Sequence, residues 1–275
     1  SRQRLSAQIA PCPRGFVVSK QDRPLALVDT SEASPLQAGM ADGTITFAGT
    51  LAGQQTARCV IYLPGADVQP EEVASLSGAE QLRVETERYW KAVLASAMQV
   101  ETPDELLNNV IRSSQIRCLI DARNEAGGAR IAPWIAAMCY GPLESEAHSV
   151  IRGIDFLGHA EFARRGLEFF IHRYNTNGFL TTGYTTFGTA WHLWTLGEHF
   201  QLSHDKLWLR QIAPEIARVG HWIVRQTEKT KKLAPRGQPA PEFGLMPPGV
   251  LADWNAFAYH FAMNAYYSAA LRDLG

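Results

Sequence analysis

The sequence lacks the features that define several common classes of protein. Its four cysteines stand far apart, with no CxxC pair and no histidine at ligand spacing. A zinc site or a disulfide scaffold is therefore a poor fit, and buried free thiols fit better. Twenty-six Lys and Arg against twenty-seven Asp and Glu leave a net charge of −1, which excludes the large basic surface of a nucleic-acid binder. No stretch approaches the roughly 18 uninterrupted apolar residues of a membrane span.

Motifs for nucleotide and hydrolase chemistry are also missing. The chain has no GxxxxGK[ST], HExxH or GxSxG, and its early glycines do not lie between a strand and a helix. We therefore expect no metal and no cofactor. The opening residues have no apolar signal-peptide core and no starting Met, so we expect a processed chain or a piece of a longer one. The compartment stays open between cytoplasmic and periplasmic or secreted.

What is present divides the chain into two parts of different character. All seven Trp lie between Trp90 and Trp254. The earlier part has short extended runs at 16–18, 25–28, 44–53 and 57–63, separated by Gly, Pro and Asp. Alternation with period two and such turn residues are typical of antiparallel strands. We therefore predict a β-sheet fragment over 1–68.

After the sheet fragment the hydrophobic period becomes helical. Residues 69–101 are predicted to form a helical connector, and Thr102-Pro103-Asp104-Glu105 has the pattern of a capping box that opens the next helix. Apolar residues at spacings of three and four indicate helices over 102–122, 148–173, 187–201, 204–229 and 254–274. Residues 102–275 thus form a predominantly helical domain, joined by three long loops, and loops of that length commonly carry function.

The first loop (124–147) places two carboxylates and an imidazole just before a buried helix. These are Glu144, Glu146 and His148, with Trp134 earlier in the loop. Sugar hydrolysis needs paired carboxylates, one protonated to assist the leaving oxygen and one ionised to activate water or attack. A structural alternative stays open, in which Ser145 or Glu144 caps the helix and Glu146 complements its positive end.

The second loop (174–186) and the third loop (230–253) add aromatic and acidic residues. Tyr184 lies in a Gly-rich stretch, and His192 follows in the next helix between Trp191 and Trp194. These two Trp residues are three apart on one helix face, and for Trp194 core packing is favoured over a sugar contact. The third loop contains Glu242 and ends in Asp253 beside Trp254. An aromatic neighbour in a partly dry pocket raises the pKa of a carboxyl toward that of a general acid, but Asp at this position also suits a helix N-cap.

Together these segments resemble the six-hairpin glycosidases. The resemblance covers roughly residues 40–275 and follows Tyr89-Trp90, Thr102-Pro103-Asp104, the stretch Glu144–His148, Gly158-His159-Ala160, Gly188-Thr189-Ala190, and Gly244-Leu245 through Asp253-Trp254-Asn255. The likeness is to glucoamylase-like and rhamnosidase-like members. It implies a β-sandwich ahead of an (α/α)6 toroid.

The resemblance implies a glycoside hydrolase that acts on an oligosaccharide or glycoside. Asp253, Glu146 and Glu144 would be the catalytic carboxylates, and the sugar would be bound by His148, Trp134, Tyr184, Trp254, Glu242 and His192. Members near glucoamylase often have an Arg-Asp pair where this chain has Glu144-Ser145-Glu146, so the contacts to sugar hydroxyls would differ. We expect no nucleic-acid or membrane partner.

The length of the helical domain limits this interpretation. Six hairpins of about 50 residues need about 300 residues, and 102–275 is shorter. We therefore expect an incomplete toroid, with the missing remainder of a longer chain or a second copy as partner. Two alternatives are a non-catalytic carbohydrate-binding or scaffold toroid and a toroid lyase or epimerase. The latter would depend on His148 or His192 with Tyr184.

Overall fold

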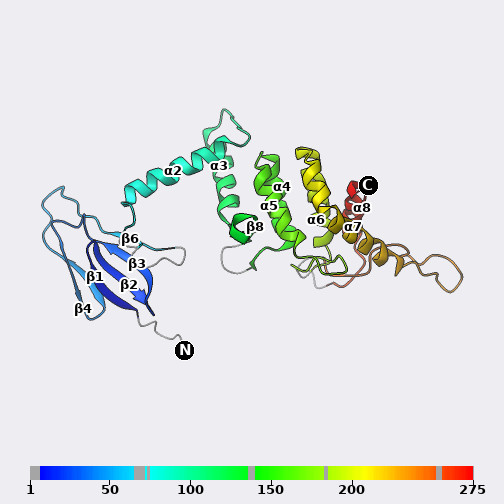
Figure 1. Cartoon of the computed structure of the whole chain (residues 1–275), viewed down its shortest axis with the longest axis horizontal. Helices are drawn as coiled ribbons and strands as arrows, with labels where there is room; N and C mark the ends of the chain where they lie inside the picture. The colour runs from blue at the N-terminus through cyan, green and yellow to red at the C-terminus, as the bar shows by residue number, and fades with distance from the viewer. Residues whose placement is uncertain are drawn as a thin grey trace. The chain divides into compact units, whose positions relative to one another are not determined.

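A computed structural model of the chain describes residues 7–64, 72, 75–135, 140–182, 185–251 and 256–274. The chain divides into two compact units, Ser1–Tyr89 and Trp90–Gly275, which we call the sheet unit and the helical unit (Figure 1). The expectation of a mainly helical chain with a small N-terminal β part is confirmed. The boundary lies inside helix α2 (Ala79–Ala95), so the two units share the predicted connector.

The sheet unit contains one four-stranded antiparallel sheet and a separate hairpin. The sheet has the order β1 (Gln8–Cys12), β2 (Gly15–Lys20), β3 (Arg23–Asp29) and β6 (Val60–Tyr62), and the hairpin pairs β4 (Gln37–Ala41) with β5 (Thr44–Ala48). The predicted runs at 16–18 and 25–28 lie in β2 and β3. Strands β1 and β4 were not predicted, because β1 contains a proline and β4 lacks β-branched and aromatic residues.

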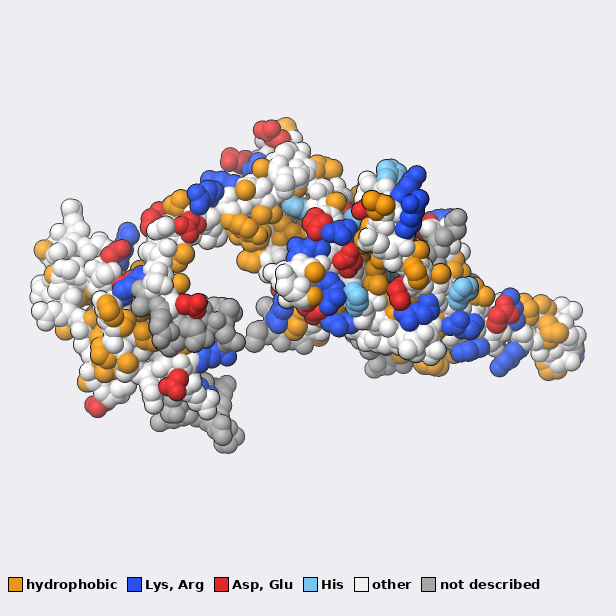
Figure 2. All heavy atoms as spheres, in the orientation of Figure 1, with side chains coloured by type: hydrophobic (Ala, Val, Ile, Leu, Met, Phe, Trp, Pro, Cys, Tyr) orange, Lys and Arg blue, Asp and Glu red, His pale blue; other side chains and the backbone are white. Residues whose placement is uncertain are grey.

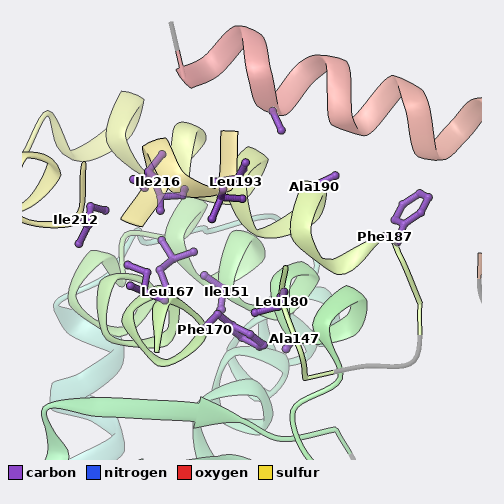
Figure 3. Close-up of a cluster of buried hydrophobic side chains, with 14 of the residues drawn as sticks. Ala147, Ile151, Leu167, Phe170, Leu180, Phe187, Ala190, Leu193, Ile212 and Ile216 are labelled. Atoms are coloured by element: carbon purple, nitrogen blue, oxygen red, sulfur yellow. The ribbon is translucent and has the colours of Figure 1, made fainter. Parts of the chain in front are cut away.

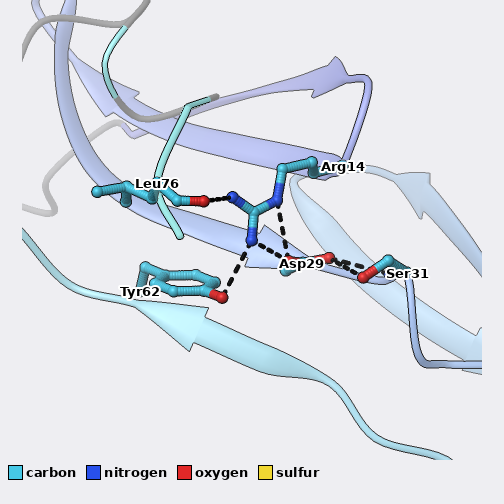
Figure 4. Close-up of polar contacts among 5 residues, drawn as sticks. All are labelled: Arg14, Asp29, Ser31, Tyr62 and Leu76. Atoms are coloured by element: carbon cyan, nitrogen blue, oxygen red, sulfur yellow. Dashed lines mark hydrogen bonds and ion pairs between the residues drawn. The ribbon is translucent and has the colours of Figure 1, made fainter. Parts of the chain in front are cut away.

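Arg14 connects the four-stranded sheet by hydrogen bonds to the segment after β6 (Figure 4). Its guanidinium donates to the Asp29 carboxylate at 3.0 Å, to the Tyr62 hydroxyl at 3.0 Å and to the Leu76 carbonyl. The hydroxyl and amide of Ser31 donate to the other oxygen of Asp29, at 2.7 and 3.0 Å. Burial alone would raise the pKa of Asp29, but the hydrogen bonds from Ser31 and Arg14 outweigh it and hold the pKa below its ordinary value.

The helical unit is a succession of helices interrupted by one short hairpin. Its elements are α3 (Glu105–Ile120), β7 (Ala122–Glu125), the 3₁₀ turn η1 (Ala126–Gly128), β8 (Arg130–Pro133), α4 (Glu144–Phe156), α5 (Ala160–Ile171), α6 (Gly188–Ser203), α7 (Lys206–Glu228) and α8 (Phe261–Leu274). The helices predicted over 102–122, 187–201 and 204–229 are confirmed as α3, α6 and α7.

The single helix predicted over 148–173 is wrong. The structure has two helices, α4 and α5, which are separated at Gly158. This glycine has φ of +92°, a left-handed conformation that ends helices and that other residues rarely adopt. Apolar residues recur without interruption from Ile151 and Ile154 in α4 to Leu167 and Phe170 in α5, so the hydrophobic pattern continues across the break.

Three smaller predictions also need correction. Helix α3 is capped by Asp104, whose carboxylate accepts from the amides of Leu106 and Leu107, and Thr102 is therefore not the cap. The last helix begins at Phe261 instead of about 254. The first loop contains the hairpin β7–β8, which was not predicted because its strands are only four residues long.

Helices α4 and α6 lie side by side and run in the same direction. At their first residues the Glu144 side chain lies against Gly188. Near their other ends the Asp155 carboxylate and the His199 ring are 2.8 Å apart. Because contacts join start to start and end to end, the two helices are parallel, and the intervening α5 runs back against them.

Helix α8 continues the same row. Trp191 near the start of α6 stacks on Tyr266 of α8, with ring centroids 5.1 Å apart. Gly197, later in α6, leaves room for Asp273 near the end of α8. Thus α4, α6 and α8 form a parallel row, with α5 and α7 returning between them. The N-terminal ends of the three helices, and the loops before them, lie at the same end of the array.

The core of the helical unit lies between this row and the returning helices. Figure 3 shows Ala147 and Ile151 of α4 facing Leu167 and Phe170 of α5, and these four residues are buried. The same cluster includes Leu180, Phe187, Ala190, Leu193, Ile212 and Ile216. Burial of this continuous cluster fixes the positions of the helix ends that carry the loops.

Charged side chains of both signs lie close together on the visible face of the helical unit (Figure 2). Many form pairs, such as Arg152 with Glu198 and Arg173 with Glu125. The mixture agrees with the nearly neutral composition. Within the described part of the chain, no helix has the length and apolar character needed to cross a membrane.

Candidate functional site

Glu144 joins the first loop to the second. It is the first residue of α4 and is only 3% exposed. The Thr185 hydroxyl donates to its Oε1 at 2.8 Å, and its Oε2 has no hydrogen-bond partner. A Cβ atom placed on Gly188 would come within 2.1 Å of the Glu144 Cγ. The side chain of Glu144 therefore needs a glycine at the start of α6.

Glu146, two residues later, is in a different environment. Its side chain is exposed, and the Ser145 hydroxyl donates to its carboxylate. The N-cap residue of α4 is Leu143, which makes no side-chain capping bond. The alternative in which Ser145 or Glu144 caps the helix is therefore wrong. Both carboxylates lie in the first turn, where the positive end of the helix favours negative charge.

His148 lies one turn along α4 and is fully buried. Its Nδ1 faces the carbonyl oxygen of Glu144, so Nδ1 carries the proton and Nε2 keeps a lone pair. Nε2 has no partner. Burial lowers the pKa of His148 to about 4, although the bond to the Glu144 carbonyl acts in the opposite direction. The imidazole is therefore neutral at pH 7.

His192 on α6 is also fully buried, and both of its nitrogens have partners. Nε2 lies 3.2 Å from the Leu167 carbonyl and Nδ1 lies 2.6 Å from the Tyr174 hydroxyl. The carbonyl can only accept, so Nε2 donates and Nδ1 accepts from Tyr174. Burial holds the pKa of His192 well below its ordinary value, with a smaller effect from His148. A sugar could contact His148 or His192 only if that ring were accessible from the surface, and both rings are fully buried.

The second loop is in turn joined to the third. The Thr186 amide donates to the Val250 carbonyl at 3.4 Å, and the Tyr267 hydroxyl of α8 donates to the Thr186 carbonyl. Gly249 and Ala258 exchange two backbone hydrogen bonds of 3.1 and 3.2 Å. A Cβ on Gly249 would come within 2.4 Å of the Thr186 Oγ1. The three loops therefore meet at one end of the helical array.

The predicted stacking residues are only partly available. Trp134 is half-buried against the core, and the Arg123 guanidinium lies 3.4 Å from the centre of its ring. The Trp194 ring is covered in the same way by Arg152, at 4.1 Å. These rings already have partners within the chain. The interpretation of Trp194 as a packing residue is thereby favoured over a sugar contact.

Four of the predicted site residues come from the second and third loops. Glu242 is half-buried in a turn where its carbonyl accepts from the Leu245 amide. Asp253, Trp254 and Tyr184 lie outside the described residues. Their assignments stay predictions.

Sequence reasoning missed Thr185 and Thr186, which connect all three loops. Thr185 is buried, and besides donating to Glu144 it accepts from the Phe187 amide at 3.2 Å. A Thr-Thr pair just before the Phe-Gly start of a helix is a local signal, since Thr hydroxyls satisfy free amides there. Tyr174 and Tyr267 gave no such signal.

Three cavities lined by described residues lie away from this end. One of about 430 Å³ lies between α6, α7 and α8 and includes Phe200, Leu209 and Asp273. A second cavity lies between α2 and α3, and a third lies between α3 and α4. Among the described residues, no group of three or more His, Cys, Asp or Glu has the arrangement of a metal site.

Comparison of this chain with protein-family models, with curated proteins and with solved structures gives no match.

Proposed function

We propose that this chain is a carbohydrate-active protein of the glycoside hydrolase type, built on part of an (α/α) toroid. The observation that carries the proposal is the meeting of the three loops at the N-terminal ends of α4, α6 and α8. Parallel inner helices joined by antiparallel outer ones are the arrangement that an (α/α) barrel repeats. Of the acids in these loops, Glu144 and Glu146 lie at this end of the array, in the first turn of α4.

The proposed chemistry uses two carboxylates on opposite sides of a sugar bond. Asp253 is the general acid, and its segment is flanked by Gly249 and Ala258, which pair with each other next to Thr186. Glu146 is the second carboxylate, because it is exposed in the first turn of α4. Trp254 and Tyr184 provide apolar faces for the sugar ring.

The test is an assay of the purified chain on a panel of aryl glycosides and oligosaccharides. Asp253→Asn and Glu146→Gln should each lower kcat by about 100-fold or more, the range expected for loss of general acid or base catalysis. Glu161→Gln is the matched control, since this exposed acid of α5 pairs with Arg164 away from the loops. Unchanged turnover in both loop variants would refute the residue assignment.

A carbohydrate-binding module without catalysis is the second candidate. It is favoured by the burial of Glu144, which is only 3% exposed, because burial keeps one of the three candidate carboxylates out of reach of a sugar. Binding of an oligosaccharide by calorimetry, with no product released, would support it over hydrolysis. Products that lack an added water would instead support a lyase.

A further inference from the structure

A continuous path of contacts leads from α4 to the third loop. The Thr185 hydroxyl donates to Glu144 at 2.8 Å, and Thr185 is bonded covalently to Thr186. The Thr186 amide then donates to the Val250 carbonyl. The path thus leads from helix α4 through the second loop to the third loop.

The hydroxyl of Thr185 has little rotational freedom in this arrangement. It donates to Glu144 and accepts from the Phe187 amide at the start of α6. The carboxylate and the helix start therefore fix the backbone that leads into Thr186. On its other side, Thr186 is in contact with Tyr267 and Met263 of α8.

The third loop packs tightly against Thr186. Gly249 packs against the Thr186 side chain with no room for a Cβ. A displacement of Thr186 would break its bond to Val250 or drive its side chain into Gly249. The pair of hydrogen bonds between Gly249 and Ala258 lies directly beyond this contact.

We propose that Glu144 is a positioning residue, which holds the third loop in place through Thr185 and Thr186 and does not touch substrate. This inference rests on the proposed function for its catalytic consequence, since the third loop carries Asp253. The structural part concerns the described residues alone. Removal of the Glu144 carboxylate should loosen Gly249 and Ala258, although neither contacts Glu144.

The experiment is hydrogen exchange with mass spectrometry on the full chain, read at the amides of Gly249 and Ala258. Glu144→Ala and Thr185→Val should each speed exchange there about tenfold, the effect of losing one buried hydrogen bond. Glu144→Gln and Thr185→Ser keep the acceptor and the donor, and should restore wild-type exchange. Glu146→Gln is the matched control on the same helix turn and should leave hydrogen exchange at Gly249 and Ala258 unchanged.

Wild-type exchange at both amides in Glu144→Ala and Thr185→Val would overturn the proposal. Equal acceleration of every amide in α6 and α8 would also overturn it, because the effect would then be general destabilisation. If Glu144→Ala does not fold, Thr185→Val alone decides the result.

Activity supplies a second readout. On any glycoside that the wild type hydrolyses, Glu144→Ala should lower kcat while Glu144→Gln retains most of it and keeps the pH profile. Loss of turnover in Glu144→Gln with unchanged exchange would show direct contact with substrate and refute a positioning role. If the wild type hydrolyses no glycoside, the proposed function fails, while the exchange experiment still decides the coupling.

Discussion

The contact between Glu144 and Gly188 provides a sharp test of how the first and second loops fit together. A Cβ atom on residue 188 would lie 2.1, 2.7 and 2.9 Å from the Cγ, Cβ and Cδ of Glu144. All three distances are below any ordinary contact between carbon atoms. We expect Gly188→Ala to lower the free energy of unfolding by about 1–3 kcal/mol, the usual cost of overpacking a tight site.

The matched control is another helical glycine with open surroundings. Gly153 is exposed in α4, and a Cβ there would meet nothing within 4 Å. Gly153→Ala should therefore stabilise the chain by about 0.5–1 kcal/mol, through helix propensity alone. The measurement is urea unfolding followed by Trp fluorescence. All Trp residues lie between 90 and 254, so the signal reports the helical unit.

A double variant shows whether the strain comes from Glu144. Glu144→Ala removes two of the three close atoms and leaves only the Cβ at 2.7 Å. Combined with Gly188→Ala it should be more stable than the sum of the single effects predicts, by about 0.5–1 kcal/mol. Equal stability of Gly188→Ala and Gly153→Ala would refute the described packing of the two helix starts.

Three further predictions concern other parts of the chain. The pKa of His148 is lowered to about 4 from 6.5. The unfolded state therefore binds a proton first as pH falls, and stability should drop between pH 6.5 and 4 by on the order of 3 kcal/mol. His148→Gln should reduce this dependence in urea unfolding and leave the part that comes from His192, whose pKa is also lowered by burial. Arg14→Ala removes donors from a buried carboxylate and should cost about 1–3 kcal/mol. Hydrogen exchange in 15–29 should rise in that variant, and unchanged exchange would contradict the role of the Arg14 network. Trypsin should cut first at exposed Lys232 or Arg236 in the third loop, and early cuts inside the helices, detected by mass spectrometry, would contradict the fold.

Helix positions could be predicted where one face is apolar and the other polar. Helix α7 is such a case, since Ile212, Ile216 and Val219 are buried at helical spacing. The boundary between α4 and α5 could not be predicted from the hydrophobic pattern, since that pattern continues across it. Gly158 was the only local sign of this boundary in the sequence, because glycine readily adopts the left-handed conformation that ends a helix.

The meeting of the loops could be suggested from the sequence, but the sequence alone does not establish it. Each loop precedes a helix, and parallel helices bring such loops to one end. Nothing in the composition shows that the helices are parallel, because this follows from long-range packing such as that of Trp191 on Tyr266. The burial of Glu144 beside exposed Glu146 depends on the same packing.

The two explanations for the acids of the first loop are not exclusive. Glu144 and Glu146 complement the positive end of the α4 dipole, and the N-cap residue Leu143 makes no side-chain capping bond there. The starts of α6 and α8 lie nearby, so the positive ends of three helices lie in the same region. Exposed Glu146 can therefore complement the positive end of α4 and, under the proposed function, also serve as the second carboxylate.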